Sequence, residues 1–120
     1  MTASAIIAIV DDDPDVRGSL DSLMRSAGLA PRCFASAEAL LADPEAIPAC
    51  VVTDLHMPGM TGLELQAELI RRGRAQPLIL MTAFPTDAAR DLAMDAGAAA
   101  FLTKPVDPDA LLDAIERAIR

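Results

Sequence analysis

Short apolar runs alternate with amphipathic stretches along this chain, and no other feature of the sequence restricts its fold as strongly. The four stronger runs span residues 5–10, 50–53, 78–81 and 99–103, and a weaker run spans residues 30–34. None of them alternates polar with apolar side chains, which is typical of strands buried on both faces, as in a parallel sheet. We expect the weaker run to be an edge strand.

Two stretches have the periodicity of amphipathic helices: the one that follows the first apolar run and the one that follows the last. In the first stretch, Gly28 can end the helix. Asp107 and Pro108 have the residue types of an N-cap and a first helical position for the last helix. The apolar residues expected to share one face are Val16, Leu20, Leu23, Met24 and Ala27 in the first helix, and Leu111, Leu112, Ile115 and Ile119 in the last.

Three further helices are predicted from the residues that would cap them. Thr61 and Glu64 match a capping box, which predicts a helix from residue 62 to about residue 72. Ser36 is expected to cap a short helix that reaches residue 42. Thr86 is expected to cap a helix that is rich in alanine and poor in large apolar side chains. We expect this last helix to pack weakly and to be a mobile element.

The chain therefore consists of a strand followed by a helix, repeated about five times. This order predicts a three-layer α/β domain with right-handed crossovers between parallel strands. A chain of 120 residues, of which 52% are hydrophobic, is long enough for one hydrophobic core. We expect a single domain over residues 1–120.

Composition and charge argue against several classes of protein. No apolar run approaches the roughly 18 residues of a membrane span, and no secretion signal follows Met1, so we expect a cytoplasmic protein without a membrane partner. Two cysteines are too few for a disulfide framework. A net charge of -8 repels phosphate backbones, and 2% aromatic residues offer few stacking platforms. Direct binding of nucleic acid is therefore not expected.

Polar side chains lie at the carboxyl ends of the predicted strands, where an open parallel sheet binds its ligands. The first strand ends in Asp11, Asp12 and Asp13, the third in Asp54, the fourth in Thr82, and the fifth in Thr103 and Lys104. Neighbouring carboxylates repel by roughly 1 to 4 kcal/mol per pair at a surface-like dielectric, so a cluster of Asp11, Asp12 and Asp54 requires a cation. Hard oxygen ligands favour Mg²⁺, with Mn²⁺ as the second candidate.

These groups are suited to phosphoryl transfer. The carboxylate of Asp54 can attack phosphorus, since aspartyl phosphates are established covalent intermediates. A metal ion and Lys104 would neutralise charge on the transferred group, and the hydroxyl of Thr82 would donate a hydrogen bond to it. The sequence thus predicts a switch that accepts a phosphoryl group on Asp54.

Several neighbouring residues have simpler interpretations. Asp13 is expected to be the N-cap of the first helix, because aspartate is favoured there. Thr103 is interpreted as a structural strand residue and the side chain of His56 as part of a loop. Cys33 and Cys50 are expected to be buried thiols.

Four segments together resemble the receiver domains of bacterial two-component response regulators. They are Val10-Asp11-Asp12-Asp13, the sequence V-T-D-L-H-M-P-G-M-T-G over residues 52–62, Thr82-Ala83, and Phe101-Leu102-Thr103-Lys104-Pro105. They occur in the family's order, and the resemblance covers the whole chain. It implies a flavodoxin-like, doubly wound five-stranded parallel sheet in the order 2-1-3-4-5. The pattern is closest to receivers that carry a DNA-binding output domain after the receiver.

The resemblance also implies a phosphorylation site. Asp54 would be the phosphoacceptor, Asp12 a direct metal ligand, and Asp11 a ligand directly or through water. The backbone carbonyl of His56 would complete the protein ligands. Lys104 would bind the phosphoryl group, and the bond from Lys104 to the following proline is expected to be cis.

A switching mechanism is implied as well. A histidine kinase would supply the phosphoryl group as phosphohistidine, and Thr82 and Phe101 would respond as a switch pair. Phe101 is equally well explained as a core residue. The face formed by the fourth helix, fifth strand and fifth helix would change and control homodimerisation or an output partner. His56 and the bulky Phe84 would gate the hydrolytic water, so slow loss of the phosphoryl group is expected.

Two other functions remain open on the sequence. A phosphatase of the haloacid-dehalogenase type would use Asp11 as its nucleophile, but Asp15 stands where that family needs Thr or Val, and the chain is short for such a hydrolase. A degenerate receiver would act only as a binding module, although the acceptor, metal and lysine positions are intact. We expect a regulatory phosphoacceptor that catalyses only its own phosphorylation and dephosphorylation, not an enzyme.

Overall fold

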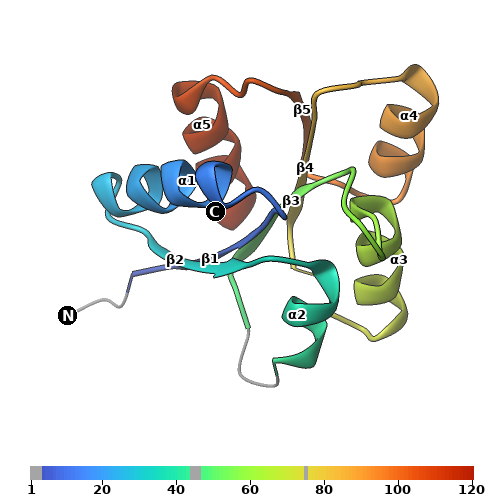
Figure 1. Cartoon of the computed structure of the whole chain (residues 1–120), viewed down its shortest axis with the longest axis horizontal. Coiled ribbons are helices and arrows are strands. Elements are labelled where there is room, and N and C mark those ends of the chain that lie inside the picture. The colour runs from blue at the N-terminus through green and yellow to red at the C-terminus, as the bar shows by residue number, and fades with distance from the viewer. Residues whose placement is uncertain (1–3, 44–46, 75) are drawn as a thin grey trace.

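The computed structural model describes residues 4–43, 47–74 and 76–120, and in this part of the chain five parallel strands form one sheet (Figure 1). The strands are β1 (Ile6–Val10), β2 (Ala30–Phe34), β3 (Cys50–Asp54), β4 (Leu78–Thr82) and β5 (Ala100–Thr103). The helices are α1 (Pro14–Ser26), α2 (Ala37–Ala42), α3 (Gly62–Arg71), α4 (Asp87–Asp95) and α5 (Pro108–Ile119). The strand order is β2-β1-β3-β4-β5, which confirms the predicted doubly wound fold.

Helices cover both faces of the sheet and produce two hydrophobic layers (Figure 1). One layer lies under α2, α3 and α4, where Leu40, Leu65 and Ala93 are buried. The other lies under α1 and α5, where Met24 and Ile115 are buried. The three-layer architecture expected from the alternating pattern is therefore confirmed.

Burial along the strands follows their place in the sheet. All residues of the central strands β3 and β4 are buried, and so is β1 apart from its first residue. The residues of β2 and β5 are half-buried or exposed, because both are edge strands with a neighbour on one side only. The prediction that residues 30–34 form an edge strand is confirmed.

The helices begin where the capping residues predicted. Asp13 is the N-cap of α1 and its side chain accepts a hydrogen bond from the amide of Asp15. Thr61 and Glu64 form the reciprocal hydrogen bonds of a capping box at the start of α3. Asp107 caps α5, where Pro108 occupies the first turn. Each cap satisfies backbone amides that have no partner within the helix.

Asp54 and Thr82 end β3 and β4, as predicted, and they pair in register with Met81 and Thr103. The structure corrects one expectation about the cysteines. Cys50 is buried as expected, but Cys33 is exposed. Cys33 lies on the edge strand β2, so its side chain is only partly covered by α1.

The helix α4 has the weak packing that its alanine-rich sequence predicted. Ala93 is its only buried residue, while Leu92 and Met94 are exposed. Within the described residues, no helix has the length and apolar character needed to cross a membrane.

Candidate functional site

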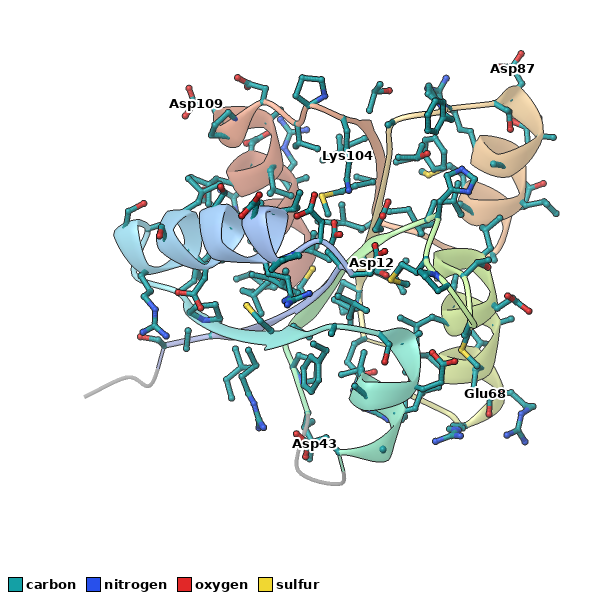
Figure 2. All side chains as sticks on the ribbon, viewed as in Figure 1. Asp12, Asp43, Glu68, Asp87, Lys104 and Asp109 are labelled. Atoms are coloured by element: carbon teal, nitrogen blue, oxygen red, sulfur yellow. The ribbon has the colours of Figure 1, made fainter. Side chains whose placement is uncertain are left out.

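The polar residues singled out from the sequence converge at the carboxyl ends of the strands. Asp11 follows β1, Asp54 ends β3, Thr82 ends β4 and Lys104 follows β5. Figure 2 shows Lys104 beyond the end of β5, with its side chain directed toward the loop after β1 where Asp12 lies. Parallel strands place all of these ends on one edge of the sheet, as expected for a ligand site in this class of fold.

Three carboxylates form an acidic cluster at this edge. Asp11, Asp12 and Asp54 each offer an oxygen, and these oxygens lie within 4.8 Å of one another. Asp11 and Asp54 are buried, whereas Asp12 is exposed. The cluster thus combines two carboxylates held inside the protein with one that is open to solvent.

Lys104 supplies the positive charge nearest to the cluster. Its Nζ lies 2.8 Å from Oδ2 of Asp11 and 3.4 Å from Oδ1 of Asp54. Burial lowers the pKa of Lys104, but the hydrogen bond and charge of Asp11, together with the charge of Asp54, outweigh this effect and raise its pKa overall. Lys104 therefore remains an ammonium group.

The surroundings of Asp54 disfavour the charged form of its carboxylate. Burial raises the pKa of Asp54, the positive charge of Lys104 opposes that shift, and the negative charge of Asp11 adds to it, so the pKa lies above its ordinary value. One ammonium group therefore does not fully compensate the buried negative charge. A cation bound at the cluster would relieve this electrostatic cost.

Asp11 is held by a hydrogen bond at each of its polar groups. Its Oδ1 accepts from the amide of Asp13 at 2.9 Å, and its Oδ2 accepts from Lys104. Its backbone amide donates to the carbonyl of Phe34 at 3.1 Å, and its carbonyl accepts from Nη1 of Arg17 at 2.8 Å. The contact with Arg17 was not predicted, because the sequence pattern gives no sign that an arginine would reach back to this carbonyl.

Gly62 brings the start of α3 close to Asp54. A Cβ atom at Gly62 would lie 2.5 Å from the carbonyl oxygen of Asp54 and 2.7 Å from Cδ2 of Leu80. The amide of Gly62 also donates to the carbonyl of Leu55 at 2.9 Å. Only glycine fits this close approach of two backbones, a requirement that becomes visible only in the folded chain.

The remaining predicted residues lie around the cluster. Thr82 is buried, and its Oγ1 accepts a hydrogen bond from the amide of Phe84 at 3.0 Å. Phe84 is 74% exposed, and its ring meets the ring of His56 edge to face with centroids 6.2 Å apart. The side chain of His56 is exposed, as the loop interpretation predicted.

Phe101 lies within β5. It is half-buried against the hydrophobic layer under α2, α3 and α4. The guanidinium of Arg90, from α4, lies 5.5 Å from the centroid of the Phe101 ring. The peptide bond between Lys104 and Pro105 is cis, as the resemblance implied.

The fold and the site together define a doubly wound α/β protein with an acidic cluster and a lysine at the carboxyl ends of its strands. Within that class, the chain belongs to the response regulator receiver domain family, whose sequence profile it matches over residues 7–116. The family resemblance predicted from the four sequence segments is confirmed.

Curated relatives support the same family. The chain is 39% identical over 117 residues to the response regulator protein TmoT of Ectopseudomonas mendocina, covering 97% of this chain and 53% of TmoT. It is 41% identical over 122 residues to the transcriptional regulatory protein FixJ of Azorhizobium caulinodans, covering 99% of this chain and 57% of FixJ. The chain thus spans about half the length of the curated relatives that it matches.

Solved structures agree with the observed fold. The crystal structure of FixJ-N superimposes with a TM-score of 0.88 at 37% identity and covers 99% of this chain and 95% of that chain. The response regulator StyR gives a TM-score of 0.84 at 41% identity and covers 98% of this chain and 60% of that chain. The fold is therefore shared with regulators of substantial sequence similarity.

Proposed function

We propose that residues 1–120 form a receiver domain in which Asp54 accepts a phosphoryl group from the phosphohistidine of a histidine kinase. The observation that carries the proposal is the convergence of Asp11, Asp12 and Asp54 within 4.8 Å, beside the ammonium group of Lys104. Family membership supports the same role. A cytoplasmic location beside the kinase is proposed on that membership alone.

The donor set fits Mg²⁺, and Mn²⁺ would be accepted for the same reason. Carboxylate oxygens are hard ligands. The pKa of Asp54 is raised by burial and by the negative charge of Asp11, which Lys104 does not fully offset. We propose that Asp12, Asp54 and the carbonyl of His56 bind the ion, with Asp11 bound directly or through water. When bound, the ion would offset negative charge on the transferred group.

The proposed transfer forms one bond and breaks one. An oxygen of Asp54 attacks phosphorus while the bond between phosphorus and the imidazole nitrogen breaks, and the electron pair of that bond stays with the imidazole. With its other ring nitrogen protonated, the imidazole leaves as the neutral base. Lys104 would donate to one phosphoryl oxygen and the hydroxyl of Thr82 to another.

The switch would then spread from Thr82 to α4 and β5. The hydroxyl of Thr82 accepts from the amide of Phe84 in the unphosphorylated protein, so a new bond to the phosphoryl group would alter the loop before α4. A response of Phe101 would also change its contact with Arg90 of α4. The proposed result is a changed face made of α4, β5 and α5.

Dimerisation is proposed to contribute to full activation. A neutral hydrogen bond stabilises by about 0.5 to 1.5 kcal/mol and a charged one by about 1.5 to 3 kcal/mol. Moving an equilibrium from 1:99 to 99:1 requires about 5.5 kcal/mol, which two contacts do not supply. The changed face would bind either a second copy of the chain or an output domain. An output domain is considered because the curated relatives are about twice as long as this chain. A phosphorylated protein that switches completely as a monomer would contradict this mechanism.

The lifetime of the phosphoryl group is proposed to depend on Phe84. Its exposed ring contacts the ring of His56, so two bulky groups lie together beside the loop after β3. We expect Phe84→Ala to speed loss of the phosphoryl group, measured by mass spectrometry after the donor is removed. An unchanged rate would remove Phe84 from the mechanism.

The central test is the position of the phosphoryl group. After treatment with acetyl phosphate and Mg²⁺, mass mapping should find one acid-stable, base-labile phosphate on Asp54, and Asp54→Asn should remain unmodified. Phosphate on Asp11 with repeated turnover of phosphomonoesters would instead identify a phosphatase. Absence of any modification under these conditions would favour a binding module.

A further inference from the structure

Arg17 makes an unusual contact for an arginine in this protein. Its Nη1 donates to the backbone carbonyl of Asp11 at 2.8 Å, from α1 back to the loop that precedes the helix. Within the described residues, no carboxylate lies at ion-pair distance from Arg17, although four aspartates occur between positions 11 and 15. By contrast, Arg25 on the same helix pairs with Asp21 at 2.7 Å. The guanidinium of Arg17 is therefore used to hold a peptide group.

That peptide group connects two residues of the acidic cluster. The carbonyl of Asp11 and the amide of Asp12 belong to one planar unit, so the orientation of the carbonyl limits the direction in which Asp12 leaves the backbone. The carboxylate of Asp12 is exposed, and the described residues give it no hydrogen bond or ion pair of its own. The position of this carboxylate therefore depends on how the backbone is held.

The contact is suited to this task because it is short and charge-assisted. A guanidinium donor gives a stronger hydrogen bond than a neutral donor, and its planar shape limits its orientation. Arg17 is half-buried, which reduces competition from water. Its amide makes the ordinary helical hydrogen bond to the carbonyl of the N-cap Asp13 at 3.0 Å, so the backbone of Arg17 is fixed within α1.

We propose that Arg17 is a positioning residue for the metal ligand Asp12, acting through the carbonyl of Asp11. The inference rests on the metal site of the proposed function. The charge of Arg17 and its hydrogen bond have opposite effects on the affinity for a cation. The positive charge lowers the affinity, whereas the hydrogen bond to the carbonyl of Asp11 raises it by preorganising the ligands. Groups that orient metal ligands typically contribute about 10- to 100-fold to metal affinity, and we expect Arg17 to contribute about tenfold.

The test measures binding of Mg²⁺ alone by calorimetry, using the full 120-residue chain and no phosphoryl donor. Arg17→Met removes the charge and the donor and should weaken binding about tenfold. Arg17→Lys retains a positive charge and one donor and should recover most of the affinity. Arg25→Met, which removes an equal charge from the exposed part of α1, should bind like the wild type.

If the wild type binds Mg²⁺ and Asp12→Asn does not, the metal site of the proposed function stands. In that case, three results would overturn the positioning role of Arg17 by itself. Tighter binding by Arg17→Met would show that the charge dominates. Unchanged binding, with lower resistance to urea in EDTA, would show a structural role only. Binding by Arg17→Lys as weak as that of Arg17→Met, with the ¹³C resonance of the Asp11 carbonyl in Arg17→Lys at its wild-type position, would show that the hydrogen bond is not the cause.

A separate measurement distinguishes this inference from the proposed function. In metal-free protein, the ¹³C resonance of the Asp11 carbonyl should shift in Arg17→Met and stay in place in Arg25→Met. If that shift is seen but the wild type does not bind Mg²⁺ through Asp12, the metal site of the proposed function fails, and the positioning role fails with it. If the carbonyl resonance does not respond, the contact itself is refuted.

Discussion

At the scale of single residues, burial and charge act against each other in the strand-end cluster. Asp54 is placed in the sheet by β3, next to buried Asp11, and Lys104 is shared between the two carboxylates. Two buried carboxylates that share one ammonium group lower the stability of the folded protein, because desolvation costs on the order of several kcal/mol per buried ion. Such an arrangement is typical of functional sites. Binding of the proposed cation and phosphoryl group would compensate the cost.

The raised pKa of Asp54 makes stability depend on pH. The folded protein retains the proton of Asp54 at pH values where the unfolded chain, with a pKa near 3.8, has lost it. The folded state then binds more protons, so stability falls as pH rises from the unfolded value through the folded value. We therefore expect Asp54→Asn to raise the melting temperature by a few degrees at pH 7 in EDTA.

This difference should shrink as the pH falls through the folded pKa of Asp54 toward 3.8, and it should be absent at lower pH, where Asp54 is protonated in both the folded and the unfolded state. Asp113→Asn is a suitable control, because Asp113 is an exposed carboxylate on α5 paired with Arg117. A wild-type protein at least as stable as Asp54→Asn at neutral pH would contradict the cost assigned to the cluster. Scanning calorimetry over a series of pH values measures both quantities.

At the scale of elements, α4 is held by few contacts, and one of them is polar. The side chain of Gln66, from α3, is buried, and its Nε2 donates to the carbonyl of Ala93 in α4 at 3.0 Å. That carbonyl also accepts from the amide of Ala98, while Gly97 has a φ of 97° at the end of the helix. The carboxyl end of α4 is thus attached to α3, whereas its first turn is exposed. Motion of α4 is expected mainly at the end nearest Thr82.

Removing the amide of Gln66 should therefore loosen α4 selectively. In Gln66→Leu, the loss of one neutral hydrogen bond should speed hydrogen exchange of α4 amides roughly two- to tenfold. Global stability should change little, because leucine retains apolar packing and the carbonyl of Ala93 still accepts from Ala98. Hydrogen exchange with mass spectrometry measures the first quantity and urea unfolding the second.

Ile70→Ala provides the control on the same helix, since Ile70 is 52% exposed. It should leave the exchange of α4 unchanged. Equal exchange rates for α4 in Gln66→Leu and the wild type would show that the helix is held by its apolar contacts alone.

At the scale of the whole molecule, the cluster joins segments from almost the full length of the chain. Asp11 and Lys104 are 93 residues apart in sequence, and they meet only when β1 and β5 lie in one sheet. A ligand that binds this edge binds the folded state and not the unfolded chain. Its binding free energy therefore adds to the stability of the entire domain.

Mg²⁺ should consequently stabilise the protein against unfolding. At a concentration ten times its dissociation constant, the gain is about 1.4 kcal/mol, seen as a higher urea midpoint with an unchanged slope. Asp12→Asn should lose the gain, because it removes the exposed carboxylate of the cluster. An equal gain from NaCl at matched ionic strength would show screening of charge in place of binding at the site.

Much of the fold and the site could be predicted from the sequence, because the relevant signals are local. The apolar runs predicted the strands, and the helical period predicted the first and last helices, since burial on one or two faces imposes its own repeat on a segment. Capping residues such as Asp13 and Thr61 predicted where helices begin. The strand-end residues Asp11, Asp12, Asp54 and Lys104 were identified because parallel strands bring their carboxyl ends to one edge.

Only the tertiary structure decided which partner each of these groups meets. The exposure of Cys33, the buried amide of Gln66 and the contact of Arg17 with the carbonyl of Asp11 all depend on how separate elements pack. The spacing of apolar residues shows which face of one helix or strand is buried, but it gives no information on distances between elements. Local order was therefore determined by the sequence itself, whereas the pairing of charges and peptide groups required the packed sheet and its helices.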